Sequence, residues 1–361
     1  MDFLFSVPVL GFILQLLAYL VHAVFTTNLP ASTLQLATPI ALGALCGVLN
    51  ERSGIVNIGI EGMMLTCAFV GWIAAVIVSD AMPEAQAGFL GFTPALFVGV
   101  IAAMGAGMLV SLLHAWLSIT VRADQIISGT VINITALGLT TYLIRLIHPS
   151  GTAGTLAQLK PPAELLDLPV IGWIIKMFFT SGPITTAVIF LVIGLQIMLF
   201  RSRWGLRTRA VGEHPRAADT VGIDVIFTRY RNVVLGGIFA GLAGAWLTLE
   251  YNASFQSGMT ANRGFIALAA VIFGRWTPIG AFGGALLFMV WEALGIAIRS
   301  NPPPGDLGVF LSGIQASYPS IYNNFFGSLP YLLTLIVLAG VVGRSTPPAA
   351  VGRPYVKEGA T

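Results

Sequence analysis

Charged residues are scarce in this sequence. Only 9% of its 361 residues are Asp, Glu, Lys or Arg, whereas 56% are hydrophobic, and the mean hydropathy is +0.86. Soluble domains carry roughly a quarter charged residues, so this composition excludes a folded surface that faces water on all sides. Apolar runs of about 20 residues recur along the chain, and each can cross the hydrocarbon core of a bilayer. The sequence therefore predicts an all-α, membrane-embedded protein.

Cysteine and histidine are scarce, and the signatures of enzymes are missing. The two cysteines, Cys46 and Cys67, lie in apolar runs and are expected to be small buried residues. The four histidines have unrelated spacings that fit neither a metal site nor a catalytic pair. No P-loop, GxSxG, HExxH or protein kinase signature is present, so we expect no catalytic residue, no metal, no cofactor and no enzyme activity. The arginines alternate with apolar spans and form no continuous nucleic-acid footprint.

About ten stretches are apolar enough to count as membrane crossings, although some of them are short. These stretches are residues 3–24, 34–49, 63–78, 94–119, 126–147, 184–200, 233–249, 264–273, 278–298 and 325–342. Residues 171–180 are expected to lie along the membrane interface, and residues 148–170 and 299–324 to form the two long outside loops. The prediction is a polytopic transmembrane helical bundle with broken or half helices.

The basic residues predict the orientation of this bundle. With ten crossings both termini lie on one side of the membrane, and thirteen of the 18 Lys and Arg residues then fall on that side. The positive-inside rule makes that side the cytoplasm, so we expect both termini to be cytoplasmic. The same distribution supports the number of crossings less strongly, because dropping two adjacent short spans leaves the ends unchanged.

One long basic interruption, from Arg201 to Arg231, holds seven of the 18 Lys and Arg residues. Within it Pro215 suits the first position of a short helix, residues 216–221 can make one or two turns, and Gly222 can end them. The small apolar face of this helix would consist of Ala217, Ala218 and Val221. The stretch is either a cytoplasmic loop that is basic by the positive-inside rule alone or a docking element for another protein.

The stretch from Gly54 to Met64, GIVNIGIEGMM, is unsuited to a plain lipid-facing helix. Irregular backbone at membrane depth is tolerated only where it is buried in protein or lines a cavity, so we expect a broken or half helix here. Asn57, Glu61 and, in a later span, Asn133 are candidates to line or shape a path across the membrane, because polar groups there are costly. Glu61 could equally cap a helix start and accept the N–H groups after Gly62.

A faint internal repeat involves the same stretch. Arg52–Gly62 and Arg263–Gly274 each place an arginine and a glycine ahead of a short interrupted helix. Paired broken segments in the two halves of a chain point to a transport pathway, although such a match is also common by chance.

Several stretches in combination resemble a known family. SGIVNIGIEGMMLTCAF (Ser53–Phe69) and AVGEHPRAADTVGI (Ala210–Ile223) resemble the permease subunits of bacterial ABC importers for nucleosides and simple sugars. This is the binding-protein-dependent type II permease family, which also includes ribose and branched-chain amino acid permeases. The stretch from Ala261 to Phe288 resembles a later signature of the family, and RPYVKEG (Arg353–Gly359) resembles its nucleoside branch. The resemblance covers the chain from roughly Leu34 to its end.

The resemblance implies one transmembrane permease domain over residues 1–361, with a cytoplasmic coupling loop at 201–231 and a cytoplasmic tail at 343–361. The loop would contain a coupling helix that fits a groove on a separate ATPase subunit. The residues that match this role are Gly212, Glu213, Pro215, Arg216, Ala217, Ala218 and Gly222. His214 stands where the family often has Asn before the proline, a difference that bears on the cap of the helix.

The resemblance also implies the partners and the function. A second permease subunit, a paralogue, and an extracytoplasmic substrate-binding protein would join the ATPase at the inner membrane. The complex would translocate nucleosides or related simple sugars with ATP hydrolysed by the separate subunit. The alternative is a secondary transporter driven by H⁺ or Na⁺, for which Glu61 is the candidate coupling carboxylate. The sequence leaves open whether the cargo is a purine nucleoside, a pyrimidine nucleoside or a sugar, and whether the two permeases are identical.

Overall fold

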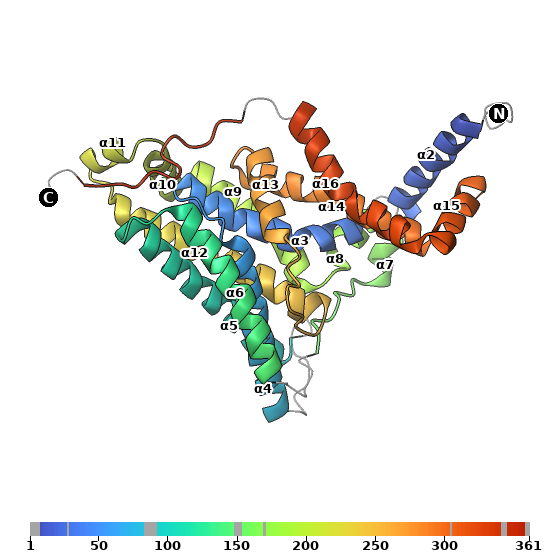
Figure 1. The fold of residues 1–361 in the computed structure, drawn as a ribbon, viewed down its shortest axis with the longest axis horizontal. Helices are drawn as coiled ribbons and strands as arrows, with labels where there is room; N and C mark the ends of the chain where they lie inside the picture. The colour runs from blue at the N-terminus through green and yellow to red at the C-terminus, as the bar shows by residue number, and fades with distance from the viewer. Residues whose placement is uncertain are drawn as a thin grey trace. The chain divides into compact units, whose positions relative to one another are not determined.

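The computed structural model describes residues 8–26, 29–82, 92–147, 154–168, 171–303, 305–340 and 345–357. The chain forms two compact units, each built from segments far apart in the sequence (Figure 1). The smaller unit comprises Met1–Ala37, Lys160–Ser181 and Leu286–Gly343, and the larger unit comprises Thr38–Leu159, Gly182–Ala285 and Arg344–Thr361. The expectation that residues 1–361 form one permease domain stays a prediction.

Within the described residues all regular secondary structure is helical, as the composition predicted. The helices are α2 (Pro8–Thr26), α3 (Leu29–Arg52), α4 (Ile60–Ala81), α5 (Pro94–Ala115), α6 (Gln125–Ile147), α7 (Ala163–Leu166), α8 (Ile171–Phe179), α9 (Pro183–Arg201), α10 (Arg203–Glu213), α11 (Pro215–Thr220), α12 (Val225–Ala245), α13 (Arg263–Phe273), α14 (Pro278–Ser300), α15 (Asp306–Ser317) and α16 (Pro319–Gly340). Two π-helical turns, Trp116–Thr120 and Trp246–Tyr251, extend α5 and α12.

Seven helical stretches among the described residues are long and apolar enough to cross a membrane. They are Leu29–Arg52, Ile60–Ala81, Pro94–Thr120, Gln125–Ile147, Pro183–Arg201, Val225–Tyr251 and Pro278–Ser300, and each matches an expected span. Helix α13 is apolar but shorter. The count of about ten is not confirmed. The first and last expected spans, 3–24 and 325–342, run into residues 3–7 and 341–342, which lie outside the described residues, as do 148–153, 169–170 and 304 of the two expected outside loops.

The basic stretch 201–231 is not a loop with one short helix, which corrects the sequence-based expectation. It holds α10, α11 and the first turns of α12, which begins at Val225. Ser202 caps α10 by accepting the N–H of Gly205, and Asp224 caps α12 by accepting the N–H of Phe227. These caps satisfy N–H groups that would otherwise lack partners, so two helices form where the arginines suggested a loop.

The expected outside loop at 299–324 is also largely helical. Helix α15 occupies Asp306–Ser317, and α16 begins at Pro319, a residue suited to the first turn because it has no N–H to leave unpaired. In the same smaller unit, the Tyr19 hydroxyl donates to the carbonyl of Asn301 at 3.0 Å, and the Trp173 indole donates to the carbonyl of Val24 at 3.0 Å. The expected interfacial segment 171–180 forms α8.

The core of the larger unit consists of α4, α5 and α12, which pack side by side (Figure 1). Small residues let these helices approach until their backbones touch. A methyl group added to Gly107 of α5 would lie 2.1 Å from the carbonyl oxygen of Gly237 in α12, and one added to Gly244 of α12 would lie 2.6 Å from that of Met64 in α4. Close packing of this kind stabilises helix pairs in membranes, where lipid offers no hydrophobic driving force between helices.

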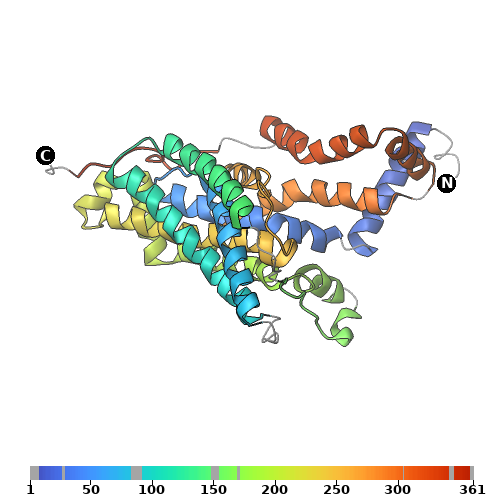
Figure 2. The same cartoon turned by 60° about the horizontal axis from the view of Figure 1, so that its bottom comes forward.

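Helices α10 and α11 lie at one end of this unit, beside the last described residues of the chain, in both views (Figure 2). The fold therefore brings residues near 215 together with residues near 350, more than a hundred positions apart.

The close approach of α5 and α12 predicts the effect of one methyl group. We expect Gly107→Ala to destabilise the protein by about 3 kcal/mol, because the methyl group overlaps a backbone oxygen that only a helix shift can move. Gly105→Ala, two residues earlier in α5, is the matched control, because nothing lies within 4 Å of its added methyl group. Thermal unfolding in detergent should show a lower melting temperature for Gly107→Ala only. Equal melting temperatures for the two variants would contradict the packing.

Candidate functional site

Between α3 and α4 the chain leaves its helical path, and residues 53–59 form a buried non-helical segment, here called the break. Ile55 and Asn57 within it are fully buried. Ile55 packs in an apolar cluster with Ala115 and Val233, from α5 and α12. The break confirms the sequence-based expectation of a broken helix, and the helix resumes at the start of α4.

Side chains from neighbouring helices bind the backbone polar groups of the break. The Oε1 of Gln125 accepts the N–H of Val56 at 2.7 Å, and the Nε2 of His114 lies 3.0 Å from the carbonyl oxygen of Val56. Because a carbonyl can only accept, the Nε2 of His114 carries the proton, and its Nδ1 accepts from the hydroxyl of Ser128 at 3.0 Å. Sequence reasoning missed His114, because its position among four scattered histidines gave no signal.

Two of the predicted path residues also bind this backbone. Asn133 of α6 donates from Nδ2 to the carbonyl of Ile58 at 3.0 Å and accepts the N–H of Gly62 with Oδ1 at 2.7 Å. Asn57 accepts the N–H of Gly59 at 3.0 Å. Both asparagines therefore shape the break. Asn57 is fully buried, whereas Asn133 is half-buried, and a role for either in lining a path stays a prediction.

Glu61 caps a helix, but not the one that the sequence suggested. Its Oε1 accepts the N–H of Asn262 at 2.9 Å, and its Oε2 accepts the N–H of Gly264 at 2.6 Å. These groups lie at the start of α13, so the carboxylate binds the positive end of another helix rather than the N–H groups after Gly62. A methyl group on Gly264 would lie 2.5 Å from the backbone of Glu61. The two segments of the faint repeat thus meet at their helix starts.

A second carboxylate does the same at the start of α9. Glu250 accepts the N–H of Ile184 at 2.7 Å, and the N–H and hydroxyl of Thr185 at 3.1 and 2.5 Å. The indole of Trp246 donates to the same hydroxyl at 2.9 Å. The residues next to Glu250 in the sequence do not indicate these partners, which lie 65 and 66 positions away. Glu61 and Glu250 therefore each satisfy two backbone donors of a helix that is distant in the sequence.

Helix α11 begins at Pro215 and ends at Thr220, one residue short of the predicted end, and Gly222 follows it with a left-handed φ of +81°. One of the three residues predicted to form the exposed apolar face, Ala218, does not lie on it. Ala218 is buried and packs with Val211 and Val225, whereas Ala217 and Val221 are exposed. Residues four apart share a helix face, so positions 217 and 221 point outward together while 218 faces α10 and α12.

Gly212 and Glu213, at the end of α10, attach this region to the rest of the larger unit. A methyl group on Gly212 would lie 2.2 Å from the carbonyl oxygen of Arg52, so α10 touches the last turn of α3. The Oε2 of Glu213 accepts the N–H of Ala349 at 3.1 Å. Of the seven predicted coupling residues, Gly212, Glu213 and Ala218 therefore hold the helices in place, and Arg216, Ala217 and Gly222 are exposed.

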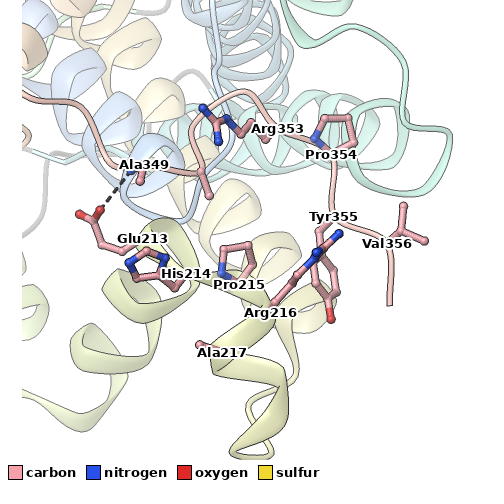
Figure 3. A pocket seen from close by; sticks show the side chains of 11 residues that line it. Glu213, His214, Pro215, Arg216, Ala217, Ala349, Arg353, Pro354, Tyr355 and Val356 are labelled. Carbon is pink, nitrogen blue, oxygen red and sulfur yellow. Dashed lines mark hydrogen bonds between the residues drawn. The ribbon is translucent and has the colours of Figure 1, made fainter. Parts of the chain in front are cut away.

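Residues 345–357, here called the tail, run along α10 and the break. The N–H of Ala350 donates to the carbonyl of Gly212 at 2.9 Å, and the N–H of Gly352 donates to the carbonyl of Gly54 at 3.1 Å. The buried guanidinium of Arg229 donates to the carbonyl of Arg353 at 3.1 Å. Between α11 and the tail lies a groove of about 560 Å³, lined by residues 213–217 on one side and by 349, 350 and 353–356 on the other (Figure 3).

The family of this chain follows from a comparison with known proteins. The family model described as "Branched-chain amino acid transport system / permease component" matches residues 29–343, which include the break, α10, α11 and α13. The chain belongs to this family. Members are permease components of ABC transporters, so hydrolysis of ATP belongs to a separate subunit. Because seven helical stretches among its described residues can span a bilayer, the chain is a multi-pass membrane protein.

Several named proteins are similar in sequence to this chain along most of its length. The guanosine ABC transporter permease protein NupQ of Bacillus subtilis is 38% identical over 90% of this chain and 95% of its own length. The nucleoside permease protein NupC of Lactococcus lactis subsp. cremoris is 37% identical over 91% of this chain and 96% of its own length. TsgC13 of Haloferax volcanii, a permease protein named for glucose, is 33% identical over 92% and 99%.

A second guanosine permease protein of Bacillus subtilis, NupP, is also similar, with 29% identity over 80% of this chain and 80% of its own length. One bacterium therefore holds two related permeases that are named for the same substrate. No solved structure matches this chain.

The double hydrogen bond of Asn133 predicts a test of the break. We expect Asn133→Leu to destabilise the protein by about 2 kcal/mol, because the carbonyl of Ile58 and the N–H of Gly62 both lose their hydrogen-bond partner. Thr130→Val, one turn earlier in α6, is the control, because the exposed Thr130 hydroxyl bonds only to its own helix at Ile126. Melting temperatures in detergent measure the difference. An equal loss in both variants would show that Asn133 does not hold the break.

Proposed function

We propose that this chain is one permease subunit of an ABC importer that translocates nucleosides, or related simple sugars, across the inner membrane. The observation that supports this most is the similarity to NupQ and NupC, which are named for guanosine and for nucleosides, over about nine-tenths of the chain. The relative named for glucose is less identical, which favours nucleosides over sugars.

The remaining subunits follow from this function. A separate ATPase supplies the energy, and a substrate-binding protein outside the membrane delivers the cargo. The second permease is a paralogue rather than a second copy, a view supported by the pair NupQ and NupP in one bacterium. Both termini, the tail and α11 lie on the cytoplasmic side, a view supported by the gathering of arginines at 201–231.

Helix α11 is the coupling helix that contacts the ATPase. Its six residues begin one residue after α10, its exposed face carries the small Ala217, and the exposed Val221 follows its last turn. Two residues hold the helix on its buried side. Gly212 brings α10 into contact with α3, and Ala218 packs α11 against α12. A movement imposed on α11 is therefore passed to buried helices rather than absorbed by a loop.

Glu61 shapes the interior and does not couple transport to an ion. Its two oxygens each accept a backbone N–H of α13, so the carboxylate is already bound in a structural role. Binding of an ion or proton there would compete with these hydrogen bonds and weaken the start of α13. Together with the family, this disfavours the alternative of a secondary transporter. Asn57, Glu61 and Asn133 hold the break and α13 at the border of the translocation path.

Uptake into liposomes tests the proposed function. The complex of this chain with its ATPase and second permease is reconstituted with the binding protein, and uptake of guanosine, uridine and ribose is measured with and without ATP. We expect ATP-dependent uptake of at least one nucleoside, and we expect that an excess of ribose does not inhibit this uptake. Glu61→Gln keeps one acceptor oxygen and should leave uptake dependent on ATP and indifferent to pH or Na⁺ gradients.

Two results would contradict this function. Uptake driven by an ion gradient without ATP, and lost in Glu61→Gln, would favour the secondary transporter. ATP-driven uptake of ribose but not of either nucleoside would agree with an ABC permease but would change its substrate class from nucleosides to sugars.

A further inference from the structure

The tail follows α10 and the break by main-chain hydrogen bonds, so its course depends little on its own side chains. The amides of Ala350 and Gly352 donate to carbonyls of α10 and of the break, and the carbonyl of Arg353 accepts from the buried Arg229. Tyr355 packs beside Val211, Ala218 and Val225, the cluster that supports α11. The tail is thereby fixed next to the proposed coupling helix, although it comes from the far end of the sequence.

The groove beside α11 has one wall from each of these segments. The α11 wall presents Pro215 and Arg216, and the tail wall presents Pro354 and Val356 (Figure 3). Two prolines restrict the backbone of the walls, so the groove keeps its shape with little conformational freedom to lose on binding. A volume of about 560 Å³ accommodates several side chains of a protruding segment.

The charge of this surface indicates what it binds. Arg216 and Arg353 are exposed on the two walls, and Arg203 and Arg207 are exposed on α10. Two carboxylates lie nearby: Glu213 accepts the N–H of Ala349, and Asp219 lies 3.9 Å from the ammonium of Lys357. Basic residues outnumber them, so the groove faces its partner as a basic surface, which acidic side chains complement.

We propose that α11 and the tail together form the docking surface for the ATPase subunit, with acidic side chains of that subunit facing Arg353. This rests on the proposed function, which requires an ATPase to dock near α11. A concave groove with stiff walls suits a protruding segment of a protein. A flat bilayer surface with anionic headgroups would not enter it.

Cross-linking in the assembled transporter tests the proposal. Val356→Cys and Ala217→Cys place a thiol on the tail wall and on α11, both at exposed positions. The native Cys46 and Cys67 are fully buried, so the introduced thiol is the accessible one on this chain, and the wild-type chain is the control. After labelling with a benzophenone maleimide and illumination, we expect both variants, and not the wild type, to cross-link to the tagged ATPase subunit.

The outcomes separate this inference from the proposed function. Cross-links from position 217 but not from 356 would overturn the shared docking surface and leave α11 as the coupling helix. Cross-links from position 356 to lipid alone would overturn it too and assign the tail to the membrane. No cross-link from either position would remove the docking role of α11 as well.

Charge reversal gives a second measurement. Arg353→Glu changes only an exposed side chain and keeps the carbonyl that Arg229 binds. We expect it to weaken the binding of the ATPase subunit to the purified permease pair by about tenfold, because it sets a carboxylate against acidic partner residues. Arg122→Glu is the matched control, since Arg122 is also exposed but lies outside both the groove and α10. Equal weakening by both variants would show a general effect of net charge and overturn the proposal.

Discussion

The structure depends on a single constraint: inside a bilayer every backbone N–H and C=O needs a partner within the protein. A continuous helix meets this constraint by itself, and the break between α3 and α4 does not. Its polar groups are bound instead by Gln125, His114 and Asn133 from α5 and α6. The starts of α13 and α9, which have free N–H groups, are bound by the carboxylates of Glu61 and Glu250. Several polar groups of the broken elements thus have partners within the protein.

The same break connects the interior to the surface on which we propose that the ATPase acts. Gly212 of α10 contacts the carbonyl of Arg52, where α3 ends, and the tail bonds to Gly54 two residues later. Asn133 bonds to the far end of the break, at Ile58 and Gly62, and Glu61 joins it to α13. A displacement of α10 and α11 has no flexible segment to absorb it before it reaches these residues. Under the proposed function, the break would be a route from ATP hydrolysis to a change in the membrane interior.

The sequence was sufficient for the class of fold, the matched spans and the short helix after Pro215, because long apolar runs and the pairing of proline with glycine are local signals. It was also sufficient for the break, since Gly54 and Asn57 disfavour a lipid-facing helix. It failed where partners are distant in the sequence. Nothing near Glu61 indicates that it caps α13, and nothing near His114 indicates Val56. The arginines of α10 and α12 suggested a loop, because dense charge is typical of one. The caps of these two helices, Ser202 and Asp224, are single residues, which give only a weak signal in the sequence.

The most direct test of this account is hydrogen–deuterium exchange of the purified transporter in lipid nanodiscs, read on peptides that cover residues 53–62 and 262–264. If side chains from other helices satisfy the broken backbone, these amides exchange as slowly as those in the middle of α4, despite their lack of helical hydrogen bonds. Exchange of these peptides within seconds, while α4 stays protected, would show that the break is open to water and would contradict the account.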